Sequence, residues 1–357
     1  MAITYHAGRR LQATSTDFGT AGAGIPAVAG GWKELGRTTL GSAGDIIDIA
    51  SLPNKRYYMV LENILGDSGE VSPEITFNGD TGTNYPIRRS NNGGTDWTST
   101  TYNYMYNAYG GTISDRFIVG YIANQSDKEK LYQHHQCINV NRSDAGTAPD
   151  RNELASKWAN TSDPIDQITV TNSGGGSFDT GAEVVILGWD DSDTHTTNFW
   201  EEIGTASGTG VLDVTASAAK KYNWIQGWYH PTTSANTGFQ LGNGSLDTGS
   251  NYSYRQSING GADGTGASTT GGFMYGTGAD ATIKMFFNIF FVNNSANEKL
   301  VICNLTYNNT AGAGTAPNRI ESVTKWANTS AQADHFGLTL SAGTADATSE
   351  VKWWGSN

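Results

Sequence analysis

The sequence predicts an all-β protein: a tandem duplication of a jelly-roll-like β-sandwich with an N-terminal arm. Three observations support this prediction. The chain repeats itself at a fixed spacing, it is rich in turn-forming residues, and its short apolar runs alternate with polar clusters. The 357 residues include 45 glycines, 16% charged residues and 11% aromatic residues. This balance is typical of β-proteins with many tight turns.

The repeat has a long and nearly constant interval. Its strongest matches are the sequences GTAP, at 146–149 and 314–317, and KWANTS, at 157–162 and 325–330. Both pairs lie 168 residues apart, and a weaker match of DTGTNY to DTGSNY keeps nearly this spacing. A solenoid unit is only about 20–50 residues long, whereas this interval has the size of a domain. The repeat therefore predicts two copies of one domain.

The repeat divides the chain into four segments. These are an N-terminal arm (1–30), a first sandwich (31–190), a linker (191–198) and a second sandwich (199–357). The arm is rich in alanine and glycine and has too few large apolar residues to form its own core. Because the linker is short, we expect the two sandwiches to pack side by side.

Within each copy, β-branched and aromatic runs alternate with Gly, Asn, Asp and Ser clusters, which predicts about eight strands per copy. The run 286–291 is apolar on both faces, as in a buried central strand. The sequence NGG, at 92–94 and 259–261, supplies the positive φ of tight turns. Segment 151–158 could be a helix by propensity, but its twin 319–326 alternates, so we predict strands in both.

Charge and composition exclude several classes of partner. The net charge is −12 and Lys and Arg form no cluster, so nucleic acid is not an expected partner. No stretch is apolar enough for a membrane span, and the N-terminus lacks the apolar region of a signal peptide. Cys137 and Cys303 do not occupy equivalent places in the repeat. We therefore favour two buried free thiols over a disulfide.

The familiar catalytic and metal-binding motifs are absent, and we predict a non-enzymatic protein with no cofactor and no metal. His134 and His135 are adjacent in an expected strand, so their rings should point to opposite faces. Asp190, Asp191 and Asp193 lack the glycine and distal glutamate of an EF-hand loop, which favours a solvated acidic linker. A pair of glycosidase carboxylates, as in a polysaccharide-degrading enzyme, stays an open alternative.

One stretch of the first copy is crowded with aromatic residues. They are Trp97, Tyr102, Tyr104, Tyr106 and Tyr109. The middle three alternate, so an extended backbone would place their rings on one face. Such a row suits either packing against another part of the assembly or binding of a sugar face, and both interpretations remain open.

Two tryptophans occur at equivalent places in both copies, Trp158 and Trp326. These residues are present in both copies although the surfaces of the copies differ, so we expect them to serve the shared fold and not a ligand site. We therefore interpret both as structural anchors of the core.

Four segments of the chain look familiar: MAITYHAGRR at 1–10, NY at 84–85, AGTAP at 145–149 and KWANTS at 157–162. Through these segments the sequence resembles virion structural proteins encoded by marine tailed viruses of bacteria or archaea. The resemblance implies a place on the particle surface as a fibre, decoration or capsid-building subunit, assembled in the host cytoplasm. It implies no known catalytic residue.

The resulting hypothesis is a non-enzymatic viral structural protein, with copies of itself and other virion proteins as partners and a trimer as the favoured oligomer. Contact with a host surface glycan fits the same hypothesis. The alternative is a carbohydrate-binding protein that uses the aromatic stretch of the first copy.

The N-terminal arm is expected to become ordered only against a neighbouring subunit or virion partner. Its anchors would be the apolar residues Ile3, Tyr5, Leu11 and Phe18, while Arg9 and Arg10 would meet acidic surface.

Overall fold

The structure, a computed structural model, describes residues 31–67, 69–106, 115–142, 144–190, 193, 198–233, 235–279, 283–308 and 313–357, with Tyr106 and 276–279 described by backbone alone. Every regular element in these residues is a β-strand, which confirms the all-β class. None of them belongs to a helix that could cross a membrane. The arm, with Ile3, Tyr5, Arg9, Arg10, Leu11 and Phe18, lies outside the described residues.

The first copy forms two antiparallel sheets. Its strands are β1 (Lys33–Thr39), β2 (Ile46–Ile49), β3 (Tyr57–Ile64), β4 (Pro73–Phe77), β5 (Ile87–Asn91), β6 (Trp97–Ser99), β7 (Met105–Tyr106), β8 (Asp115–Ala123), β9 (Lys130–Asn139), β10 (Asp150–Trp158), β11 (Ile168–Asn172) and β12 (Glu183–Trp189). The large sheet has eight strands in the order β1-β12-β3-β8-β9-β10-β5-β6. The small sheet has four, in the order β2-β11-β4-β7.

The second copy repeats this arrangement. Its strands are β13 (Glu201–Ser207), β14 (Asp213–Thr215), β15 (Tyr222–Tyr229), β16 (Ala235–Gly242), β17 (Tyr252–Ile258), β18 (Gly264–Thr269), β19 (Gly272–Ala279), β20 (Lys284–Val292), β21 (Lys299–Asn308), β22 (Asn318–Trp326), β23 (His335–Leu340) and β24 (Glu350–Ser356). The sheet orders are β13-β24-β15-β20-β21-β22-β17-β18 and β14-β23-β16-β19. The two copies match strand for strand, which confirms the tandem duplication.

Each copy is a jelly-roll-like sandwich in which the chain crosses repeatedly between the large and the small sheet. The described residues form twelve strands per copy, so the expected number of about eight was too low. Strands such as β6, with three residues, and β7, with two, account for part of the difference. Elements this short cannot show a period-two pattern in the sequence.

Two local predictions are confirmed. The twin segments expected to be strands lie in β10 and β22. In the NGG turns, Asn92 and Gly93 have φ of 49° and 67°, and Asn259 and Gly260 have φ of 55° and 72°. These are the positive values that a tight turn between two twisted strands requires.

The central strand β20 is apolar on both faces because each face packs on a different layer. Phe287 and Ile289 are fully buried in the core of the second sandwich. Phe290 and Val292 point the other way and belong to a third core, shared between the two copies. A strand between two apolar layers needs no polar face.

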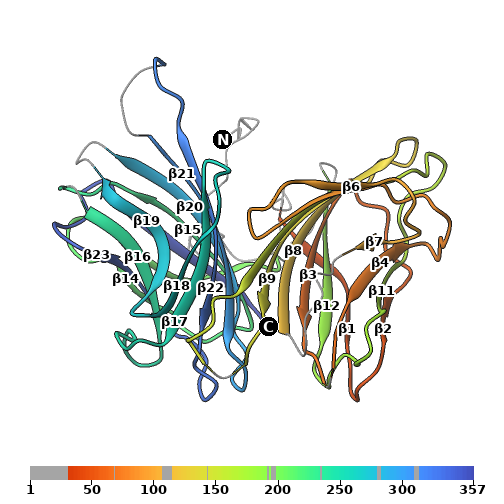
Figure 1. Cartoon of the computed structure of the whole chain (residues 1–357), viewed down its shortest axis with the longest axis horizontal. Helices are drawn as coiled ribbons and strands as arrows, with labels where there is room; N and C mark the ends of the chain where they lie inside the picture. The colour runs from red at the N-terminus through yellow and green to blue at the C-terminus, as the bar shows by residue number, and fades with distance from the viewer. Residues whose placement is uncertain are drawn as a thin grey trace, which may run out of the picture.

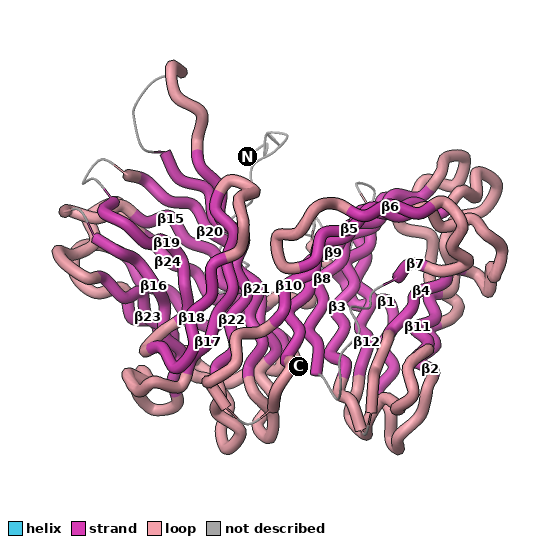
Figure 2. The backbone as a smooth tube through the Cα atoms, viewed as in Figure 1, coloured by secondary structure: helices cyan, strands magenta, loops and turns pink. Residues whose placement is uncertain are grey.

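The two large sheets pack against each other and close this shared core. Val185 and Leu187 of β12 belong to it from the first copy, and Tyr222 and Phe290 belong to it from the second. The two sandwiches therefore lie side by side, with β9 and β22 near the middle of the molecule (Figure 1 and Figure 2). A continuous apolar layer between sheets resists relative motion of the copies.

Buried polar contacts also join the copies. Arg151 of the first copy pairs with Asp263 of the second at 2.7 Å, and the side chains are 5% and 3% exposed. Glu183 accepts a hydrogen bond from Tyr222 Oη at 2.8 Å and pairs with Lys221 at 3.0 Å. Charged groups removed from water in this way are stable only with their partners in place.

Candidate functional site

The aromatic stretch of the first copy forms a tilted cluster. Trp97 begins β6 and is 42% exposed. Its ring centroid lies 5.7 Å from that of Tyr102 and 4.6 Å from the Arg89 guanidinium. The Tyr102 and Tyr104 rings lie 5.0 Å apart with planes at 43°. The chain bends at 103–104, between these two tyrosines and at the second, so the rings do not form the flat row that an extended backbone would give.

The cluster also faces inward more than its sequence pattern suggests. Tyr102 packs against the core of the first sandwich. Burial raises the pKa of Glu74, and hydrogen bonds from Ser173 and Tyr104 act in the opposite direction. The side chain of Tyr106 and the whole of Tyr109 lie outside the described part of the chain.

The two repeated tryptophans are buried in the cores of their sandwiches. Trp158 and Trp326 are each 1% exposed. Their indole nitrogens donate to the carboxylates of Asp80 and Asp247, at 2.7 and 2.8 Å. In both copies the KWANTS segment therefore contacts the DTG segment, so one of the strongest matches of the repeat meets the weaker DTGTNY/DTGSNY match in space.

The aspartates of these contacts are held ionised. Asp80 also accepts hydrogen bonds from the Gly82 amide at 2.8 Å and from Asn84 Nδ2 at 2.9 Å. Partial burial acts to raise the pKa of Asp80, but the bonds from Trp158, Asn84 and Gly82 outweigh it and lower the pKa. The second copy repeats the same pattern at Asp247. These residues organise the fold of each copy.

The two adjacent histidines point to opposite faces of β9, as expected. His134 is buried with Nε2 2.9 Å from Asn152 Oδ1, and burial lowers its pKa to about 4. His135 lies on the other face, with Nδ1 4.0 Å from Glu153. Within the described ranges, no group of three His, Cys, Asp or Glu side chains is placed to hold a metal.

The prediction for the two thiols is confirmed, whereas the prediction for the linker is wrong at one residue. Cys137 and Cys303 are buried and free, as expected. Asp193, however, forms an ion pair with Lys55 and its side chain is only 9% exposed. The expectation of a solvated linker was therefore wrong at this residue, because the loop before β3 brings Lys55 to it.

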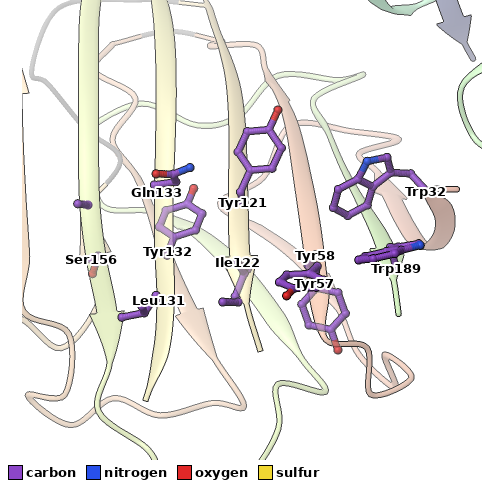
Figure 3. Close-up of a pocket in the computed structure, with 12 residues that line it drawn as sticks. Trp32, Tyr57, Tyr58, Tyr121, Ile122, Leu131, Tyr132, Gln133, Ser156 and Trp189 are labelled. Carbon is purple, nitrogen blue, oxygen red and sulfur yellow. The ribbon is translucent and has the colours of Figure 1, made fainter. Parts of the chain in front are cut away.

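A pocket of about 590 Å³ lies on the large sheet of the first copy. Figure 3 shows the lining residues spread across the sheet, from β10 through β9, β8 and β3 to β12, with Trp32 just before β1. Tyr58, Ile122 and Tyr132 point to the opposite face, into the core of the first sandwich. The lining residues are Trp32, Tyr57, Tyr58, Tyr121, Ile122, Ala123, Leu131, Tyr132, Gln133, Ala155, Ser156 and Trp189. Trp32, Tyr57, Tyr121 and Trp189 supply the aromatic surface of the pocket, because Tyr58 and Tyr132 are buried in the core of the first sandwich. None of the twelve residues is charged, so the pocket suits a neutral ligand.

The pocket continues the sheet face that forms the shared core. Side chains alternate along a strand, so Tyr57 lies on the same face as Met59 and Leu61 of β3. Met59 and Leu61 contact the second copy, whereas Tyr57 is 37% exposed. On β12, Leu187 lies in the shared core and Trp189 lines the pocket. The second copy therefore covers only part of this face.

An aromatic pair lies at one end of the pocket. Tyr57 and Trp189 are directly opposed in the β3–β12 ladder. Their rings stack with centroids 5.4 Å apart and planes at 19°. The sequence pattern missed this site because both residues fall at the ends of runs that predict buried strands. The two residues are 132 positions apart, so only the strand pairing brings them together.

No family model matches the chain, and no curated protein matches it. Two of the similar solved structures are mouse laminin alpha1 chain domains LG4-5 and the LG1-3 region of the laminin alpha2 chain. The first has 10% identity and a TM-score of 0.20, covering 93% of this chain and 92% of that chain. The second has 7% identity and a TM-score of 0.20, covering 87% and 64%.

Proposed function

We propose that the protein is a non-enzymatic structural protein of a virus particle surface that assembles with copies of itself. The observation that carries the proposal is the apolar core shared by the two large sheets. It joins two similar sandwiches into one block. Three such chains around an axis provide six similar modules, which suits fibres, decoration proteins and capsid subunits.

The distribution of repeated residues supports a scaffold role. The motifs present in both copies place Trp158 on Asp80 and Trp326 on Asp247, inside each sandwich. The exposed aromatic Trp97 and the pocket with Trp189 belong to the first copy alone. A duplicated scaffold with different surfaces fits a building block that meets different neighbours.

The proposed location is the virion, after assembly in the host cytoplasm. The proposed partners are further copies of the chain, other virion proteins and a host surface glycan. The sequence resemblance to virion structural proteins of marine tailed viruses supports this assignment.

Light scattering and negative-stain imaging of the purified full chain test the proposal. We expect a concentration-dependent homo-oligomer, with a trimer as the basic unit, that appears as a ring, rod or shell. A monodisperse monomer at high concentration, with isolated particles in the images, would contradict it.

A carbohydrate-binding protein that uses the aromatic stretch of the first copy is the second candidate. The exposed Trp97 ring, with Arg89 4.6 Å from its centroid, is the observation that favours it. A glycan array with the native chain and Trp97→Ala tests this candidate. A defined sugar that binds the native chain and not the variant would support it, and binding that survives the substitution would exclude this surface.

A further inference from the structure

We propose that the pocket on the large sheet of the first copy binds a neutral oligosaccharide. The pocket is a different site from Trp97, and it goes beyond the structural role proposed above. It is lined by strands β10, β9, β8, β3 and β12, next to the part of the sheet that the second copy covers (Figure 3).

The apolar part of the lining suits the C–H faces of sugar rings. Trp32, Trp189 and Tyr57 gather at one end, and Tyr121 and Leu131 lie on the neighbouring strands (Figure 3). Aromatic side chains bury large apolar areas and keep a polar atom at the rim. A sugar has the same mixed character, with apolar C–H groups and outward hydroxyls.

The polar atoms of the pocket lack partners within the described part of the chain. The hydroxyls of Tyr57 and Tyr121, the amide of Gln133 and the indole nitrogens of Trp32 and Trp189 make no hydrogen bond there. They provide both donors and acceptors, as sugar hydroxyls require. By contrast, the neighbouring hydroxyl of Tyr58 has two carbonyl acceptors within hydrogen-bond distance, Pro53 O at 3.0 Å and Ile165 O at 2.9 Å.

Charge and size narrow the ligand class. The twelve lining residues include no charged side chain, and the neighbouring Arg56, whose guanidinium lies 5.9 Å from the Tyr57 ring centroid, is already engaged within the protein. An acidic or sulfated glycan would therefore lose its hydration for little gain in ion pairing. A volume of about 590 Å³ is within the range of small-ligand pockets. A short neutral oligosaccharide fits both limits. A protein segment is the competing occupant, but an apolar segment would leave the free phenol, amide and indole groups without partners.

The experiment uses the full-length chain and follows tryptophan fluorescence and titration heat. The probes are four neutral trisaccharides, namely maltotriose, cellotriose, mannotriose and chitotriose, with a hyaluronan tetrasaccharide as the charged comparison. We expect at least one neutral probe to bind. Tyr57→Ala and Trp189→Ala should each weaken it by about tenfold or more, because buried aromatic contacts dominate such sites. Trp189→Phe, which keeps a ring, should retain part of the affinity.

Two matched variants control for surface and for folding. Trp228→Ala and Phe286→Ala remove rings that are 41% and 43% exposed on the second copy. Both should leave the affinity unchanged. The proposal is overturned if no neutral probe binds, if the charged probe alone binds, or if binding survives Trp189→Ala. These experiments measure sugar binding and not the oligomeric state. A negative result would therefore overturn this proposal without bearing on the structural role, which light scattering tests separately.

Discussion

At the scale of single residues, equivalent positions of the two copies have different surroundings because the contact between copies is not symmetric. Arg151 is 5% exposed and pairs with Asp263 of the other copy, whereas its equivalent Arg319 is 61% exposed and pairs with the neighbouring Glu321. Glu183 is 5% exposed at the contact, whereas Glu350, in the same place on β24, is 51% exposed. The duplication therefore supplies a matched control for each contact residue.

Glu183→Gln tests the ionic contact between the copies. The Glu183 carboxylate pairs with Arg37 and Lys221, both at 3.0 Å. Loss of its charge leaves Lys221 without this ion-pair partner and leaves Arg37 paired only with Glu34. We expect the free energy of unfolding in urea to fall by about 1–3 kcal/mol. Glu350→Gln removes only a surface pair with Lys352 and should change it by less than about 1 kcal/mol. Equal effects at both positions would contradict the assignment.

The effect of Glu183 should also depend on pH. Burial acts to raise the pKa of Glu183, but the hydrogen bond from Thr39 and the charge of Lys221 outweigh it and lower the pKa. A lowered folded pKa stabilises the fold at pH values above the unfolded pKa, and this stabilisation is lost as the pH falls through the folded value. The stability difference between the native chain and Glu183→Gln should therefore be constant at neutral pH and shrink below about pH 4. A constant difference down to pH 2 would contradict the ionic contact.

Asp80→Ala and Asp247→Ala test the anchors of the two sandwiches. Each substitution leaves a buried indole N–H, of Trp158 or Trp326, without its acceptor. We expect each to lower the free energy of unfolding by about 1–3 kcal/mol. Asp96→Ala, which removes an exposed pair with Arg88, serves as the control. If only one of the two substitutions lowers the free energy of unfolding, the two copies do not share this Asp–Trp contact as an anchor.

At the scale of elements, the sequence predicted what depends on local pattern. The NGG turns, the strand nature of 151–158 and the double apolar face of β20 all follow from turn chemistry and side-chain alternation. The short strands β6 and β7 could not be predicted, because two or three residues carry no periodicity. The bend at Tyr102 and Tyr104 follows from tertiary packing that alternation does not report.

Gly93→Ala and Gly260→Ala test the hairpin contact between the copies. Both glycines have positive φ, so both variants incur a backbone cost of about 1–2 kcal/mol. A Cβ at Gly93 would lie 2.3 Å from Asp263 Oδ1 and 3.0 Å from its amide nitrogen, whereas one at Gly260 would meet only the Arg319 guanidinium at 3.0 Å. Gly93→Ala should therefore cost about 1–3 kcal/mol more in urea unfolding, because Asp263 must move away from Arg151. Equal costs would show that the hairpin contact does not hold Asp263 in place.

At the scale of the whole molecule, the sequence predicted the duplication but not the pocket. The repeat follows directly from matched motifs, and the side-by-side packing follows from the short linker. The pocket combines Trp32, Tyr57, Leu131 and Trp189 from four distant segments, and strand order alone brings them together. In the sequence, the pocket residues look like core residues, because no sequence pattern indicates how much of the sheet the second copy covers.

The shared core predicts that the two sandwiches unfold together. Leu61 and Leu187 of the first copy, and Phe290 and Ile302 of the second, are buried only while the copies stay in contact. Separating them would expose a continuous apolar layer, at a cost of about 25 cal/mol per Å². Independent sandwiches joined by a linker would carry no such cost.

Differential scanning calorimetry of the full chain tests this coupling most directly. We expect a single transition with a calorimetric enthalpy close to the van't Hoff enthalpy, which Leu61→Asp should split or broaden by placing a charge in the shared core. Two separate transitions in the native chain, or an unchanged profile in Leu61→Asp, would contradict a fused double sandwich.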